Sequence, residues 1–209
     1  MRYNVVLLPE ERVSRAAIEY SAQLPPDGRQ IALGWDETLP HVSLYMLMLE
    51  SDAVEESSLR IKHIAQECTK FALRATQYNT SFGYFDVEYE KPSELTLLQQ
   101  QVLEALNPLR SGMYAKDEER LRHAQGERKH NLETYGWASI GSFFRPHLTI
   151  TKYSEDRIDI PHVEIQQFSG DYPSIALVEM AEFGTARALV SRFDLVRSNV
   201  TTAKGKVQL

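Results

Sequence analysis

The sequence is poor in cysteine, in long hydrophobic runs and in net positive charge. Cys68 is the only cysteine among 209 residues, which excludes an internal disulfide and any metal cluster held by several cysteines. Because no run resembles a signal peptide or a membrane span, we expect a soluble, cytoplasmic protein without a membrane partner. A formal net charge of -6 argues against a long nucleic-acid duplex as partner, but it is compatible with a nucleotide or a short RNA end.

Nucleotide-binding loops and metal-ligand clusters are also missing. The chain has no Gly-x-x-x-x-Gly-Lys-Ser/Thr and no Gly-x-Gly-x-x-Gly, which argues against an ATPase or a dinucleotide enzyme. Glu127 and His130 have a Glu-x-x-His spacing that metal ligands use on helices, but one copy without further carboxylates is weak. We therefore predict neither a metal nor a cofactor.

One five-residue motif, Pro-His-aliphatic-hydroxyl-aliphatic, is present twice. The copies are Pro40-His41-Val42-Ser43-Leu44 and Pro146-His147-Leu148-Thr149-Ile150. In an extended strand residues i and i+2 lie on one face, so each copy presents an imidazole beside a hydroxyl while its aliphatic residues face a core. A single copy is more often structural. Two copies with the same flanking pattern favour a shared active site to which both contribute.

The sequence resembles the 2H phosphoesterase superfamily, which includes the LigT-like 2′,5′ RNA ligases and the 2′,3′-cyclic nucleotide phosphodiesterases. The two His-x-Ser/Thr motifs carry the resemblance, together with the opening residues 2–9 and the residues 143–152 around the second motif. Ser43 stands where many members have threonine, and it keeps the hydroxyl.

This resemblance implies an α+β fold with two pseudo-symmetric lobes, each an antiparallel sheet with helices on its outer face, around a central cleft. It also implies a metal-independent phosphodiesterase acting on 2′,3′-cyclic phosphates or 2′,5′ bonds of nucleotides or RNA ends. His41 and His147 would then be the acid/base pair, with Ser43 and Thr149 holding phosphate oxygens. The alternative is a 2H-like module that binds a nucleotide or RNA end without turnover.

Four further residues are candidates for substrate binding. Arg145 and Lys152 flank the second motif and could hold phosphate charge, although a solvated surface position is as common. Tyr45 and Tyr153 share a face with the motif residues if the strands alternate regularly. Either tyrosine could stack on a base, and either could equally close the core.

Because no low-complexity tract or long Pro/Gly/Ser linker divides the chain, we predict a single bilobal domain over residues 1–209, which we expect to be a monomer. We place the first motif lobe at about 1–110, a charged helical connector at about 111–136, and the second motif lobe at about 137–209. The expected strands lie at 3–8, 39–49, 82–89, 176–182 and 188–196, and the expected helices at 10–24, 57–78, 93–109 and 113–133. Residues 25–28 read as a turn, and the polar tail from 198 reads as frayed.

Overall fold

The computed structural model describes residues 1–36, 38–155, 161 and 163–196. These residues form ten strands and five α-helices, with four short 3₁₀ turns between them. In chain order the elements are β1 (Arg2–Leu8), α1 (Glu11–Gln23), β2 (Arg29–Ala32), β3 (Val42–Met48), α2 (Ala53–Glu67), β4 (Phe71–Leu73), β5 (Ala75–Ser81), β6 (Tyr84–Tyr89), α3 (Ser93–Leu106), η1 (Asn107–Leu109), α4 (Ala115–Leu121), α5 (Gly126–Tyr135), η2 (Gly141–Phe143), β7 (His147–Tyr153), η3 (Ile165–Phe168), β8 (Gly170–Tyr172), β9 (Ser174–Met180), η4 (Glu182–Gly184) and β10 (Ala186–Asp194).

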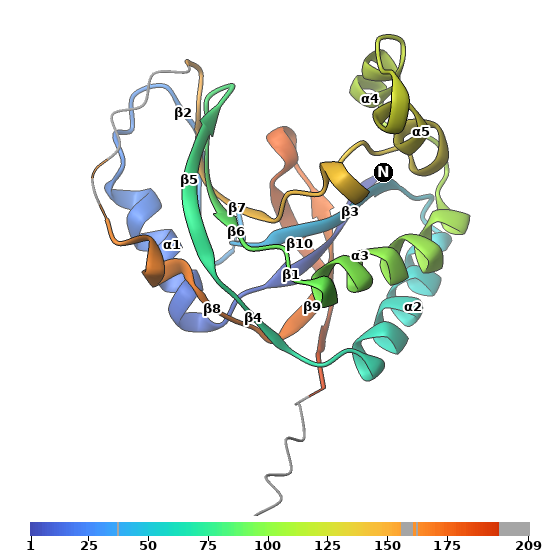
Figure 1. The fold of residues 1–209 in the computed structure, drawn as a ribbon, viewed down its shortest axis with the longest axis horizontal. Helices are drawn as coiled ribbons and strands as arrows, with labels where there is room; N and C mark the ends of the chain where they lie inside the picture. The colour runs from blue at the N-terminus through green and yellow to red at the C-terminus, as the bar shows by residue number, and fades with distance from the viewer. Residues whose placement is uncertain (37, 156–160, 162, 197–209) are drawn as a thin grey trace, which may run out of the picture.

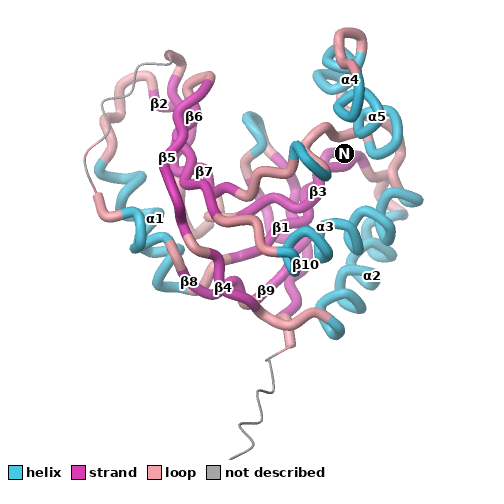
Figure 2. Tube along the Cα trace, viewed as in Figure 1, coloured by secondary structure: helices cyan, strands magenta, loops and turns pink. Residues whose placement is uncertain are grey.

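Two four-stranded antiparallel sheets form the framework. One has the order β10-β9-β1-β3 and the other the order β2-β7-β6-β5, while β4 and β8 form a small separate pair. Figures 1 and 2 show the two sheets as two arms that meet near β3 and β7. Each sheet combines strands from both predicted motif lobes, so the lobe boundaries predicted at 110 and 137 do not separate the sheets. Sequence periodicity identifies strands but not their partners, which explains the error.

Helices cover the outer faces of both sheets. Helix α1 contacts β2 and β7, whereas α2 contacts β9 and β10 and α3 contacts β3. The predicted α+β class with helix-covered antiparallel sheets is confirmed. Between α3 and β7 the charged connector forms two helices, α4 and α5, in place of the single helix predicted.

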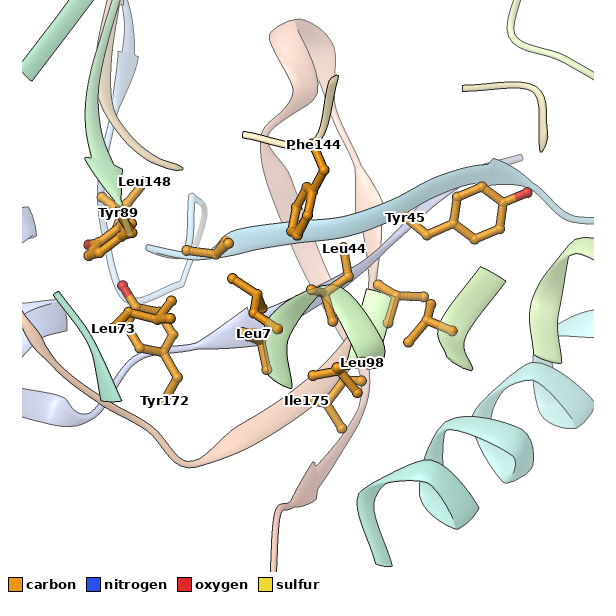
Figure 3. Close-up of a cluster of buried hydrophobic side chains, with 14 of the residues drawn as sticks. Leu7, Leu44, Tyr45, Leu73, Tyr89, Leu98, Phe144, Leu148, Tyr172 and Ile175 are labelled. Atoms are coloured by element: carbon orange, nitrogen blue, oxygen red, sulfur yellow. The ribbon is translucent and has the colours of Figure 1, made fainter. Parts of the chain in front are cut away.

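The core is continuous across the two sheets. Leu7 and Leu44 from one sheet lie in the same buried cluster as Leu148 from the other, and Leu98 of α3 closes it from outside (Figure 3). These four side chains are at most 1 % exposed. Burial of a side chain of this size contributes about 1.5–3 kcal/mol, so the core fixes both motif strands in one unit.

The structure corrects one predicted helix. Helix α2 ends at Glu67, and Cys68 is already extended, with φ -94° and ψ 127°. Residues 71–78, predicted as the end of that helix, belong instead to β4, to the start of β5 and to the one residue between them. Threonine and aromatic residues in this stretch favour a pleated strand, and pairing with β6 and β8 outweighs the helical spacing. Strand β2 follows the predicted turn and was missed, whereas the two closing strands are confirmed as β9 and β10.

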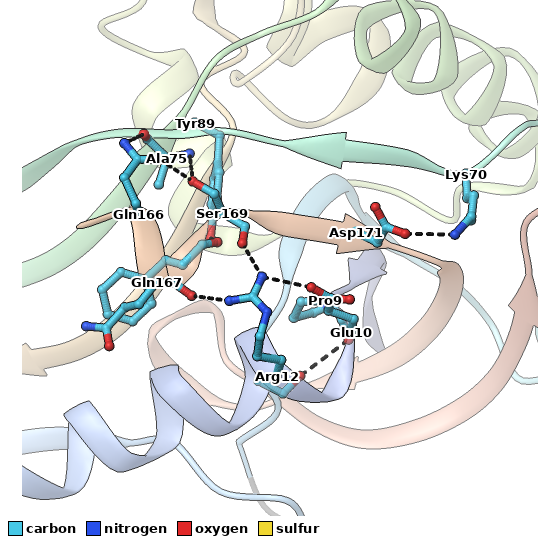
Figure 4. A network of polar contacts seen from close by, with 12 residues as sticks. Pro9, Glu10, Arg12, Lys70, Ala75, Tyr89, Gln166, Gln167, Ser169 and Asp171 are labelled. Carbon is cyan, nitrogen blue, oxygen red and sulfur yellow. Dashed lines mark hydrogen bonds and ion pairs between the residues drawn. The ribbon is translucent and has the colours of Figure 1, made fainter. Parts of the chain in front are cut away.

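A polar clasp holds the return segment, defined as η3 and Ser169, which leads into β8 (Figure 4). Arg12 of α1 donates through Nη1 to the Gln167 carbonyl at 3.0 Å and through Nη2 to Glu10 at 2.8 Å. On the other side Ser169 Oγ accepts the Ala75 N–H at 2.9 Å. The clasp therefore fixes this return segment between α1 and β5.

No helix in the described ranges is long and apolar enough to cross a membrane. The tail predicted to fray, from 198 onward, lies outside the described residues.

Candidate active site

The two motifs lie at corresponding places in the two sheets. The first begins just before β3, which pairs with β1, and the second opens β7, which pairs with β6. Strands β3 and β7 contact each other where the sheets meet (Figure 1). The fold thus brings together two segments that are about a hundred residues apart in the sequence.

Both motif histidines are held by the same local hydrogen bond. Nδ1 of His41 lies 2.7 Å from the Leu39 carbonyl oxygen, and Nδ1 of His147 lies 2.7 Å from the Arg145 carbonyl oxygen. A proline lies between the histidine and its carbonyl partner in both segments, and its ring restricts φ at that position in each. Because a carbonyl oxygen only accepts, Nδ1 carries the hydrogen in each ring, and Nε2 keeps its lone pair when the ring is neutral. Both half-buried imidazoles therefore leave Nε2 available for proton transfer.

The environment of His41 favours its neutral form. Burial lowers the pKa of His41 from 6.5 to about 4, against the opposing effect of its bond to Leu39. The charge of His147 lowers the pKa of His41 further, so the two rings are close enough to interact electrostatically. At neutral pH, His41 is thus an unprotonated imidazole.

A β-bulge follows the hydroxyl residue in both motifs. Ser43 pairs with Val6 and Tyr45 with Val5, which leaves Leu44 as the extra residue. In the other sheet Thr149 pairs with Asp86 and Thr151 with Phe85, which leaves Ile150 extra. Since cross-strand partners share a face and neighbours on a strand face opposite ways, each bulge reverses the alternation beyond it.

The bulges turn the two candidate tyrosines into the core. Tyr45 is 0 % exposed, and its hydroxyl lies 2.8 Å from the Tyr135 carbonyl oxygen and 3.0 Å from Asn107 Oδ1 (Figure 3). Tyr153 is 7 % exposed and donates to the Pro25 carbonyl at 2.7 Å. The predicted positions of Tyr45 and Tyr153 beside the histidines are therefore wrong, and both tyrosines are structural.

The motif hydroxyls contact two polar residues that sequence reasoning missed. Ser43 Oγ accepts a hydrogen bond from Asn4 Nδ2 at 2.8 Å, whereas Thr149 donates to Asp86 Oδ1 at 2.7 Å. Asn4 and Asp86 are 0 % and 3 % exposed. Buried polar residues inside otherwise apolar strands are unusual, and this was the available signal for both.

The two basic candidates are already engaged within the protein. Arg145 is half-exposed and lies between two carboxylates, with Nη1 3.1 Å from Glu88 and Nη2 3.8 Å from Asp86. Lys152 is the residue of β7 paired with Tyr84, and it donates to Gln30 at 2.7 Å while lying over the Tyr84 ring. Substrate binding by Arg145 and Lys152 stays a prediction.

The Glu-x-x-His pair of α5 has a structural contact. Glu127 accepts hydrogen bonds from the N–H and the hydroxyl of Ser142, which ties α5 to η2. Within the part of the chain that the structure describes, no three histidine, cysteine, aspartate or glutamate residues are grouped to hold a metal ion.

Comparison with known families gives one sequence match. A family model described as "Protein of unknown function (DUF1045)" matches residues 47–166, more than half of the chain. The chain belongs to the DUF1045 family. The matched region of this DUF1045 protein includes the second motif and begins just after the first. No curated protein matches the chain in sequence.

Solved structures extend the comparison to nearly the whole chain. TT0787 of Thermus thermophilus has a TM-score of 0.60 and 18 % identity, over 95 % of this chain and 100 % of its own. E. coli LigT in its apo form has a TM-score of 0.57 and 14 % identity, over 94 % of this chain and 98 % of its own. E. coli LigT complexed with 3′-AMP matches over the same shares, with a TM-score of 0.57 and 15 % identity. This DUF1045 protein therefore has the LigT-like 2H phosphoesterase fold.

Proposed function

We propose that the protein is a metal-independent phosphodiesterase of the 2H type, acting on 2′,3′-cyclic phosphate or 2′,5′-phosphodiester bonds of nucleotides or RNA ends. The observation that carries the proposal is the matched pair of imidazoles, each held through Nδ1 by the carbonyl two residues earlier. The E. coli LigT structure with 3′-AMP supports a nucleotide phosphate as ligand of this fold.

His41 is the general base in this proposal and His147 the general acid. Neutral His41 takes a proton from water through Nε2, the water oxygen bonds to phosphorus, and the bond from phosphorus to the ribose oxygen breaks. His147 gives its proton to the leaving oxygen. Proton exchange with solvent then restores both rings. Each such transfer typically contributes about 10²–10⁴-fold to the rate.

The test is hydrolysis of a panel of 2′,3′-cyclic nucleotides and 2′,5′-linked dinucleotides in excess EDTA. We expect turnover by the native protein and a loss of about 10²-fold or more in kcat for His41→Ala and for His147→Ala. His63→Ala is the matched control, because His63 is an exposed residue of α2 beside Glu67. Full activity in either motif variant would remove that histidine from the acid/base pair.

Nucleotide binding without turnover on the whole panel would instead favour the non-catalytic binding module. Loss of turnover in EDTA that returns with added metal would contradict the metal-independent mechanism.

A further inference from the structure

Arg2, at the start of β1, is a largely buried cation with few partners. Its side chain is 19 % exposed, and its ion pair with Asp117 is loose, at 3.9 Å. Within the described residues the guanidinium makes one hydrogen bond, from Nη2 to the sulfur of Met46 at 3.5 Å. Burial lowers the pKa of Arg2, but an arginine keeps its proton. A full positive charge therefore lies here with most of its N–H donors unused.

Arg110 lines the same hollow and has no such deficit. All three of its guanidinium nitrogens donate to protein oxygens, at 2.6–3.3 Å. A charged hydrogen bond to a carboxylate or phosphate is about 2.7–2.9 Å long, so neither Met46 nor Asp117 replaces the hydration that Arg2 loses on burial. An oxyanion would supply the acceptors that the protein does not.

The charge around Arg2 also favours an anion. Asp117 is 2 % exposed and shared, because its Oδ1 accepts from Arg120 Nη1 at 2.8 Å. Two guanidinium groups thus face one carboxylate, although the whole chain has a net charge of -6. The Tyr114 ring lies over Arg2, with its centroid 3.9 Å from the guanidinium carbon. Stacking covers a face of the guanidinium and leaves the N–H donors in its plane free.

Arg2 lies on the face of β1 that carries the first motif's partner. Arg2 and Asn4 are two residues apart on one strand, so they share a face about 7 Å apart, and Asn4 contacts Ser43. Tyr84 has the corresponding place on β6, two residues before Asp86. Burial raises the pKa of Tyr84 and the charge of Arg2 lowers it, so Arg2 and Tyr84 lie close enough to interact.

We propose that Arg2, with Arg120 beside it, binds a second phosphate of the ligand. This phosphate would lie about 7 Å further along β1 than the group at the motif hydroxyls. The ligand class is thus a nucleotide with two separate phosphates, such as a nucleoside bisphosphate. Asp117 positions both arginines and competes with the phosphate for Arg2. The inference rests on the proposed function for the place of the reacting phosphate.

The experiment is calorimetric binding of adenosine 3′-monophosphate and of adenosine 3′,5′-bisphosphate. The native protein is expected to bind the bisphosphate at least about tenfold more tightly, the scale of one hydrogen bond between charged groups. Arg2→Gln should abolish this preference, and Arg2→Lys, which keeps the charge but loses the planar fork, should keep part of it. Equal affinity of the native protein for the two nucleotides would overturn the inference.

Arg74→Gln is the matched control for the loss of one positive charge. Arg74 is an exposed arginine paired with Glu90, so this variant should keep the full preference for the bisphosphate. Thermal denaturation of each variant separates a folding defect from a binding effect. A destabilised Arg2→Gln protein that keeps the preference would show that Arg2 only holds α4 in place, and this result would also overturn the inference.

Asp117→Asn is a further variant with the opposite expectation. The amide has the shape of the carboxylate without its charge, so it no longer competes with a phosphate for Arg2, and the preference for the bisphosphate should rise. An unchanged or smaller preference in folded Asp117→Asn would contradict the competition assigned to Asp117.

Binding and turnover separate this inference from the proposed function. A preference for the bisphosphate that depends on Arg2, without turnover of the cyclic and 2′,5′-linked panel, supports the inference and contradicts the phosphodiesterase. Turnover with equal binding of the two nucleotides does the reverse. Failure of both nucleotides to bind overturns the inference, and turnover of the panel then decides the proposed function by itself.

Discussion

The two halves of the site share the geometry of their histidines and differ in the chemistry behind their hydroxyls. Beside Ser43 lie a neutral amide, Asn4, and the apolar residue Val6. Beside Thr149 lies Asp86, and the guanidinium of Arg145 lies between Asp86 and Glu88 of β6. The duplicated motif thus sets the position of the two histidines, while the neighbouring strand sets the hydrogen-bond partner of each hydroxyl.

The largest expected effect is a loss of stability when Tyr45, the residue after the bulge of the first motif, is replaced. Tyr45→Ala should lower the free energy of unfolding by about 3–5 kcal/mol, because it removes a fully buried ring. Tyr45→Phe should cost about 1 kcal/mol, since it keeps the ring and loses the hydroxyl contacts. Denaturant titration measures both. A small stability loss with a raised KM in Tyr45→Ala would mean that this side chain faces the ligand after all.

The bulges also mark the limit of prediction from sequence. The duplicated motif correctly predicted two strands with matching histidines and hydroxyls, because period-two alternation is a local property. Alternation failed after Leu44 and after Ile150, where no glycine or proline marks the bulge, so the faces of Tyr45 and Tyr153 were predicted wrongly. Whether an extra residue is accommodated depends on the partner strand.

The pairing of the strands also could not be predicted from the local sequence pattern. Strand β1 lies between β3 and β9, so three distant segments form the sheet behind the first motif. Asn4 and Asp86 become neighbours of the motif hydroxyls only through such pairing. Their polarity within apolar strands was visible in the sequence, but their partners were not.

The second prediction concerns how the protonation of His41 changes the free energy of unfolding with pH. Because the pKa of His41 is about 4 in the folded protein and 6.5 in the unfolded chain, the unfolded chain binds the proton first as the pH falls. The free energy of unfolding should therefore decrease between pH 6.5 and pH 4, by up to about 3 kcal/mol from this residue. His41→Asn should show a correspondingly flatter acid limb in denaturation curves.

The same pKa sets the acid limb of activity. If the proposed function holds, kcat/KM of the native protein should fall only as the pH approaches 4, well below the range of an ordinary histidine. Parallel stability curves for the native protein and His41→Asn, or an acid limb near pH 6.5, would contradict the neutral state assigned to His41.

A third, smaller effect tests whether Asn4 acts through Ser43. Ser43→Ala and Asn4→Ala should each lower kcat/KM by about tenfold, the scale of one oriented hydrogen bond, and the double variant should lose little more than either single variant. Because Asn4 is buried, thermal unfolding of each variant is measured alongside the kinetics. Independent, multiplying losses in the double variant would show that Asn4 does not act through Ser43.

The smallest expected effect tests the role of Arg145, which lies beside the second motif. Its guanidinium is half-exposed and shared by Glu88 and Asp86, so Arg145→Gln should change the free energy of unfolding by less than about 1 kcal/mol. If Arg145 mainly offsets the carboxylates, phosphate affinity should fall only a few-fold, and less at high salt than at low salt. If Arg145 instead contacts the phosphate directly through two guanidinium nitrogens, Arg145→Gln should lower phosphate affinity far more. That loss should persist at high salt. Arg74→Gln, which removes an exposed arginine paired with Glu90, is the matched control for the change in net charge. Calorimetric phosphate titrations at two salt concentrations therefore decide whether Arg145 binds the phosphate directly or only offsets the charge of Glu88 and Asp86.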